Sequence, residues 1–407
     1  MSPHKVLTAA EVAQQQSFPD VGLHIMGVGS QYPGGTCTAQ QLRDFAYRHY
    51  PRTPALEKLL AINENTGIDV RSVVCNVDHP LMNMARAPTI DELSDIFLTE
   101  GVKLAAGAAR QAIEEWGGDV SQITHVVATT CTNSANPGYD YYVAKELGLG
   151  STVERTLLHG VGCAGGLAAL RNAANIALGL SFMKRPARVL VVACELASLL
   201  VRSELDSLNQ NQDLRIGLTI FSDGASAAVL SNGIGEDPDA KPVYELLGWD
   251  HRTVPESDKD IGFDVHPSGW KVILTPRVPT LASISTPPLM AALLPRIPSV
   301  AHMMPADFDW VVHPGGLKVL MSIEKIMGLS SPQLRASYDV YKNHGNCSGA
   351  TIFSVFNRLR QKDMGPGREY VMGLAFGPGV AVEMCVFRRP GATPFSPTDS
   401  GNSSDVE

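Results

Sequence analysis

The chain has 407 residues, of which 44% are hydrophobic, and this length is enough for two or three core-forming units. Its formal net charge of −8, without a basic stripe or arm, argues against nucleic acid as a partner. The first 20 residues are polar and no run of about 18 uninterrupted apolar residues occurs, so the sequence predicts no signal peptide, no membrane span and a cytoplasmic location.

In chain order, residues 1–21 form a polar segment that we expect to be loosely held. After it, apolar β-branched runs alternate with longer helical patterns, which predicts an α/β fold. The tail at 390–407 is rich in Pro, Ser, Thr, Gly and Asp, a composition typical of disorder. The clearest predicted strands are residues 124–130, 188–194, 226–230, 309–313, 370–375 and 380–387.

The cysteines are scattered, odd in number and include no C-x-x-C pair. This pattern argues against a disulfide framework and against a zinc or redox motif. The seven residues are Cys37, Cys75, Cys131, Cys163, Cys194, Cys347 and Cys385.

The order of segments in the first half recurs in the second half. A strand, a helix, G-C-A-G-G and a second strand are followed later by a strand, a helix, G-N-C-S-G and a second strand. Thr130 and Cys163 are 33 residues apart, as are His313 and Asn346. This spacing predicts a duplication with a site at the junction of the two copies. The predicted halves are residues 22–245, carrying the cysteine, and residues 246–389, carrying the histidine and asparagine.

Cys163 follows glycines that permit a sharp turn and precedes a stretch, residues 167–180, that is apolar on nearly every helical face. At the start of a buried helix, free N–H groups and the helix dipole would favour a thiolate and lower the pKa from roughly 8.5. The small residues after it leave room for a bulky acyl group. The alternative is a small apolar cysteine packed in a Gly/Ala-rich helix contact.

His313 ends a buried-looking strand, and Pro314 then turns the chain, which leaves the imidazole at a strand end where sites form in α/β folds. Asn346 lies at a glycine turn that enters a helix, so it could be a cap or a hydrogen-bond donor to an enolate oxygen. If the halves pack as a repeat, these two residues and Cys163 supply a nucleophile, a proton partner and an oxyanion donor.

Three further features have ordinary structural explanations. The loop G-V-G-S-Q-Y-P-G-G resembles a phosphate-binding loop, but Tyr32 stands where the dinucleotide fingerprint needs glycine. Phe221 in I-F-S-D-G-A is expected in the core. Gly377-Pro378-Gly379, between two strands, is most simply a tight turn.

Together, the motifs resemble those of type III polyketide synthases, the chalcone-synthase-like family. They are G-C-A-G-G at Cys163, H-P-G-G at His313, G-N-C-S-G-A at Asn346 and F-G-P-G-V-A-V-E at Phe376. The resemblance extends over about residues 21–389. The segments I-M-G-V-G-S-Q-Y-P and D-V-H-P-S-G-W-K-V resemble the fungal branch.

This resemblance implies a five-layered αβαβα thiolase fold, a homodimer, and CoA thioester substrates without metal or organic cofactor. It implies that Cys163 takes an acyl starter as a thioester. His313 and Asn346 would hold the malonyl thioester carbonyl during decarboxylation, and the resulting enolate would attack the acyl group. His313 would also help to keep Cys163 ionised.

The resemblance also implies the residues of the substrate cavity. Phe221 matches the gatekeeper between the CoA tunnel and the cavity. Ala197 stands where chalcone synthases have threonine, Val272 where they have a second phenylalanine, and T-N-S-A-N-P-G replaces the loop with a cross-dimer methionine. Smaller walls favour a long aliphatic acyl-CoA starter and an alkylpyrone, alkylresorcinol or alkylresorcylic acid product. The other cavity positions implied are Ser348, Gly377 and Pro378.

CoA phosphates need cations despite the acidic chain. Arg71, in G-I-D-V-R-S, and Lys318, in H-P-G-G-L-K, lie near positions that line the family's CoA tunnel. The alternative for each is an ordinary surface residue.

Other functions stay open at this point. A ketoacyl-ACP synthase III has H-Q-A-N where this chain has H-P-G-G, and a hydroxymethylglutaryl-CoA synthase needs an acidic base that the sequence does not place. A papain-like protease has the order Cys, His, Asn, but its C-G-S-C-W surroundings and disulfide cysteines are missing. A non-catalytic binding protein is a further alternative.

Overall fold

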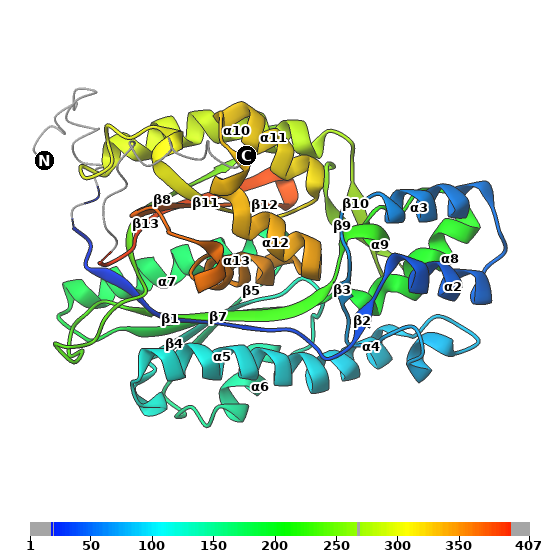
Figure 1. Cartoon of the computed structure of the whole chain (residues 1–407). Coiled ribbons are helices and arrows are strands. Elements are labelled where there is room, and N and C mark those ends of the chain that lie inside the picture. The colour runs from blue at the N-terminus through cyan, green and yellow to red at the C-terminus, as the bar shows by residue number, and fades with distance from the viewer. Residues whose placement is uncertain (1–17, 19, 267–268, 392–407) are drawn as a thin grey trace, which may run out of the picture.

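The computed structural model describes residues 18, 20–266 and 269–391 (Figure 1). The predictions for the loosely held segment 1–21 and the disordered tail 390–407 fall mostly outside these residues. Within the N-terminal segment, the Phe18 ring packs on Trp249, with ring centroids 5.0 Å apart.

Nine strands form one mixed sheet in the order β11-β12-β13-β8-β1-β7-β6-β4-β5. Two short antiparallel pairs, β2–β3 and β9–β10, lie outside it. The strands are β1 Leu23–Gln31, β2 Thr36–Cys37, β3 Arg71–Ser72, β4 His125–Thr129, β5 Glu154–Leu158, β6 Arg188–Leu196, β7 Asp223–Ser231, β8 Tyr244–Thr253, β9 Ile261–His266, β10 Gly269–Leu274, β11 Phe308–Val312, β12 Tyr370–Gly377 and β13 Ala381–Arg388. All six predicted strands are found within a few residues of their predicted bounds.

Helices and strands stack in five layers, which confirms the expected thiolase-type α/β fold (Figure 1). One group of outer helices covers the strands of the second half, a central group lies between the two sets of strands, and another outer group covers the strands of the first half. Three hydrophobic clusters lie between these layers. In that order, the helices are α10 Val278–Leu293 and α11 Leu317–Met327; α7 Gly165–Phe182, α12 Arg335–His344 and α13 Thr351–Leu359; and α5 Val102–Trp116 and α6 Tyr139–Glu146.

The remaining helices form a lobe beside the layers, together with β2, β3, β9 and β10 (Figure 1). Local signals explain where its helices begin. Thr38 forms a capping box with Gln41, and Thr53 caps a helix whose first residue is Pro54. The helices are α2 Ala39–His49, α3 Pro54–Glu64, α4 Ile90–Ile96, α8 Val201–Asn211 and α9 Gly217–Ile220.

One segment, Val278–Arg296, is long and apolar enough to cross a membrane by length and composition alone. Half of it is buried inside the fold, and Leu281, Leu289 and Leu293 belong to the cluster beneath α10. A helix that packs one face against the core has this hydropathy.

The internal repeat is visible in the topology. β4 pairs in parallel with β6, and β11 pairs in parallel with β12. Each of these crossovers contains a buried central helix, α7 in the first half and α13 in the second. A short 3₁₀ turn precedes each central helix, at Gly162–Ala164 and Ser348–Ala350, and the two turns contact each other.

Candidate active site

Cys163 lies in the 3₁₀ turn that leads into α7. The turn needs glycine, because Gly162 has φ +53° and a Cβ there would lie 2.7 Å from Pro378 Cδ. Gly377 makes a similar contact, since its Cβ would lie less than 3.0 Å from Val161 O and from Ala164. The predicted cavity residues Gly377 and Pro378 thus hold the end of β12 directly against the cysteine turn.

Asn346 is fixed by backbone hydrogen bonds to the segment that carries Phe221. Its N–H donates to Ile220 O and its carbonyl accepts from Ser222 N, both at 2.9 Å. Its side-chain Oδ1 accepts from Ser348 N at 2.7 Å. With Oδ1 used in this way, the Asn346 Nδ2–H groups are left as the donors that the side chain can offer.

The two helix starts approach closely, as the repeat predicts. A Cβ on Gly166 would lie less than 3.0 Å from Ile352 Cγ2 and from Gly349 O, and a Cβ on Gly349 would lie 3.0 Å from Gly162 O. Only hydrogen atoms fit in these gaps, so α7 and the turn after Asn346 meet through their backbones.

The predicted catalytic residues and most of the predicted cavity residues line three small cavities. The first, of about 30 Å³, is lined by Cys163, His313, Asn346 and Phe221 with apolar side chains around them. The second, of about 20 Å³, shares Cys163 and Phe221 and adds Cys131, Val272, Ser348 and Pro378. A third, of about 20 Å³, contains Ala197, at the end of β6, with Val272 and Phe221.

Burial dominates the electrostatics of the site. Desolvation raises the pKa of the Cys163 thiol to about 11, although hydrogen bonding with Ser348 and Asn346 acts in the opposite direction. The thiol donates to Ser348 Oγ at 3.5 Å. Desolvation also lowers the pKa of His313 to about 3. The expectation of a lowered thiol pKa is therefore wrong, and both groups are neutral at pH 7.

His313 is 1% exposed, and neither ring nitrogen has a hydrogen-bond partner among the described residues. Its backbone N–H donates to Leu374 O at 2.8 Å, which fixes the residue at the end of β11. A buried, unpaired imidazole that lines a cavity calls for a polar ligand atom beside it.

Sequence reasoning missed an acidic group near the cysteine. Glu195 is fully buried, and its carboxylate accepts hydrogen bonds from Thr132 Oγ1 at 2.8 Å, Thr130 Oγ1 at 3.2 Å and Cys131 N at 3.0 Å. Burial raises its pKa to about 7. The available signal was a glutamate inside the otherwise apolar strand R-V-L-V-V-A-C-E-L.

The two predicted CoA-binding cations differ in exposure. Arg71 is 5% exposed, and its Nη1 donates to Asn63 Oδ1 at 2.6 Å and to Thr219 O at 2.8 Å. The alternative of a surface residue is wrong for Arg71, which links β3 to α3 and α9. Lys318 is exposed at the start of α11, next to Val319, which lines the first cavity.

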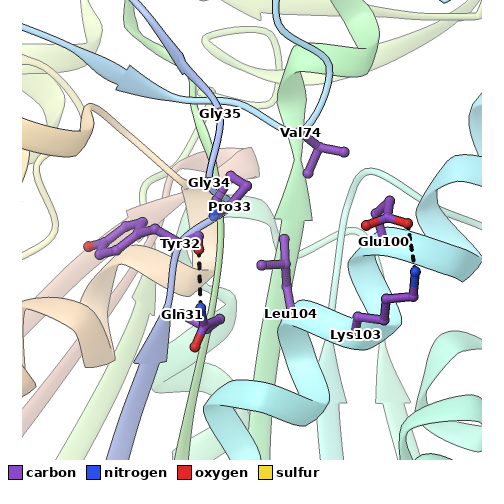
Figure 2. Close-up of a pocket in the computed structure, with 9 residues that line it drawn as sticks. All are labelled: Gln31, Tyr32, Pro33, Gly34, Gly35, Val74, Glu100, Lys103 and Leu104. Carbon is purple, nitrogen blue, oxygen red and sulfur yellow. Dashed lines mark hydrogen bonds and ion pairs between the residues drawn. The ribbon is translucent and has the colours of Figure 1, made fainter. Parts of the chain in front are cut away.

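A roomier cavity of about 340 Å³ lies at the glycine-rich loop that follows β1 (Figure 2). Gln31 Nε2 donates to Tyr32 O at 3.2 Å, and Lys103 pairs with Glu100 at 2.9 Å. None of the predicted site residues lines it, so it is separate from the cysteine site.

The chain matches known families over nearly its whole length. Residues 23–238 match the model of the N-terminal domain of chalcone and stilbene synthases, and residues 246–390 match the model of their C-terminal domain. It is 36% identical to acylalkylpyrone synthase csyB of Aspergillus oryzae (93% of this chain, 98% of that protein). It is 38% identical to type III polyketide synthase pspB of Penicillium soppii (91% and 97%).

Solved structures of type III polyketide synthases are also similar to this chain. A type III pentaketide synthase from Neurospora crassa is 53% identical with a TM-score of 0.89, covering 90% of this chain and all of the other. CsyB complexed with CoA-SH is 37% identical with a TM-score of 0.88 at the same coverage. With its paired halves and its cysteine, histidine and asparagine around one cavity, the chain belongs to the chalcone and stilbene synthase family, the type III polyketide synthases.

Proposed function

We propose that this enzyme loads an acyl group from acyl-CoA onto Cys163 and extends it by repeated decarboxylative Claisen condensation with malonyl-CoA. The observation that carries the assignment of roles is the single cavity lined by Cys163, His313 and Asn346, at the junction of the two halves.

In the loading step, the Cys163 sulfur attacks the starter thioester carbon while His313 accepts the thiol proton. The carbon–sulfur bond to CoA breaks, and the proton passes to the departing CoA sulfur. Because burial keeps both groups neutral beforehand, proton transfer and attack are coupled in this scheme.

In the extension step, malonyl-CoA loses carbon dioxide and leaves an enolate. His313 and the Nδ2–H of Asn346 donate to its oxygen, as neutral donors in a dry site can. The enolate carbon then forms a bond to the acyl carbon on Cys163, and the cysteine sulfur leaves. Ser348 Oγ, 3.5 Å from the sulfur, is positioned to accept a hydrogen bond from the thiol.

A long aliphatic starter suits the small walls at Ala197 and Val272, with Phe221 as the gatekeeper. Cyclisation of the extended chain would then give an alkylpyrone, alkylresorcinol or alkylresorcylic acid. The printed function of csyB, an acylalkylpyrone synthase, supports this product class.

We further infer that Lys318 offers a cation to CoA, that Arg71 acts through the packing around it, and that no metal or organic cofactor takes part. The chain should act as a homodimer, and the exposed edge strand β5 offers a surface for pairing. The seven free cysteines suit a reducing, cytoplasmic location.

The test is Cys163→Ala, assayed with malonyl-CoA and an acyl-CoA panel by mass spectrometry of products and of the intact protein. The variant should form neither polyketide nor an acyl-enzyme adduct. Cys385→Ala, which removes a buried thiol outside the cavities, is the matched control and should retain both. A folded Cys163→Ala enzyme that still makes polyketide would refute the assignment.

A further inference from the structure

Glu204, on α8, is a buried acid that lines the third cavity with Ala197, Val272 and Phe221. It is 2% exposed. Glu204 belongs to none of the sequence motifs described above. Burying a glutamate in an apolar cavity without hydrogen-bond partners costs free energy.

Only one of its two carboxylate oxygens is hydrogen-bonded. Glu204 Oε1 accepts from Val272 N at 2.9 Å, whereas Oε2 has no hydrogen-bond partner among the described residues. Arg215 Nε, which also has no hydrogen-bond partner among the described residues, forms an ion pair with Oε2 at 3.8 Å, a distance too long for a hydrogen bond. Arg215 therefore balances the charge but leaves the lone pairs of Oε2 available.

The third cavity lies next to the cysteine site. It shares Phe221 and Val272 with the second cavity, which holds Cys163 and Ser348. In the proposed function, His313 and Asn346 hold the CoA thioester carbonyl in the first cavity. The acyl chain on Cys163 would then extend toward the second and third cavities, past Val272, with Glu204 at the far end.

The available space suits a small polar group. The third cavity measures about 20 Å³, which is room for one water-sized group. A chain that reaches it from Cys163 passes along Phe221, which lines all three cavities.

We propose that Glu204 determines starter specificity by accepting a hydrogen bond from a hydroxyl at the distal end of the acyl chain. A hydroxyl there donates to Oε2 and completes its bonding, whereas a terminal methyl leaves a buried oxygen unpaired. The preferred starter is thus a hydroxylated acyl-CoA. This inference rests on the proposed function and names the substrate class within it.

The experiment compares straight-chain acyl-CoA starters, from short to long, with ω-hydroxyacyl-CoA starters of equal length. The measured quantity is the ratio of kcat/KM for the hydroxyl-ended starter to that for the methyl-ended one. In the wild type, this ratio should peak at one chain length at roughly tenfold, the value of one hydrogen bond to a charged acceptor.

Two variants of Glu204 test the assignment. Glu204→Gln keeps an oxygen for Val272 N but replaces the charged acceptor by an NH₂ group, which can only donate a weaker, neutral hydrogen bond to the hydroxyl oxygen, so the peak should fall severalfold. Glu204→Leu should lower the ratio further and improve turnover of methyl-ended chains. Gln210→Leu, exposed on the same helix, is the matched control and should leave the ratio unchanged.

A ratio near unity at every length in the wild type, or an equal peak in Glu204→Gln and the wild type, would overturn the inference. Glu204→Gln decides the question if Glu204→Leu fails to fold. Absence of polyketide from every starter would instead refute the proposed function, so the two failures are distinguishable.

Discussion

The contact that joins the two halves can be tested with one methyl group. In Gly166→Ala, the added Cβ would lie less than 3.0 Å from Ile352 Cγ2 and from Gly349 O, where a stiff β-branched side chain and a backbone atom have to yield. Overpacking of this kind costs about 1–3 kcal/mol. Movement of Gly349 also shifts Asn346 relative to Cys163, and a displacement near 1 Å can cost about 10² in rate.

Gly179→Ala is the matched control. It lies in the same helix, α7, and its added Cβ would meet nothing within 4 Å. Both changes gain about 1 kcal/mol of helix propensity, so this gain cancels when the variants are compared. The free energy of unfolding should therefore be about 1–3 kcal/mol lower for Gly166→Ala than for Gly179→Ala.

Urea denaturation gives the stability difference, and product formation from malonyl-CoA gives the activity. Gly179→Ala should be as active as the wild type, and Gly166→Ala should lose most of its activity even where it is fully folded. Equal stability and equal activity in the two variants would show that the backbone contact does not hold the site together.

Three other perturbations probe the site. His313→Ala and Asn346→Ala should each slow carbon dioxide release from malonyl-CoA by about 10²–10³, and unchanged release in both would place the enolate donors elsewhere. Burial raises the pKa of Glu195 from 4.5 to about 7, so between these values the folded state keeps a proton that the unfolded state has released, and the wild type loses stability as pH rises from about 4.5 to about 7. Glu195→Gln should therefore gain stability relative to the wild type over this range, and a constant difference would contradict this. Ala197→Trp should abolish turnover of long-chain starters, whose burial is worth about 0.8 kcal/mol per methylene, while short starters survive; an unchanged chain-length preference would remove Ala197 from the tunnel.

The fold could be predicted from the sequence because the patterns that indicate it are local and occur in both halves of the chain. Apolar runs predicted the strands, and equal spacing before Cys163 and Asn346 predicted the facing helix starts, which the contact of the two 3₁₀ turns confirms. Each of these predictions depends only on periodicity and on the order of segments along one chain.

The properties of the site that could not be predicted from the sequence are those that depend on how deeply each side chain is buried. The helix start at Cys163 suggested a lowered pKa, but the direction reverses because desolvation in the packed cavity exceeds the stabilisation by nearby donors. Arg71 appeared to be a candidate surface cation until packing placed it beneath α9. The burial and hydrogen bonding of Glu195 and Glu204 could not be predicted, because their neighbours come from distant parts of the chain.

The backbones of Phe221 and Asn346, the proposed gatekeeper and the proposed enolate donor, are directly paired. Phe221 and Asn346 form a parallel β-bridge, and the flanking backbone hydrogen bonds at 2.9 Å hold both main chains in place. These bonds involve main-chain atoms only, so rotation of the Phe221 ring would leave the Asn346 backbone in place. Because Phe221 lines all three small cavities, a movement of this one side chain would change the shape of each of them.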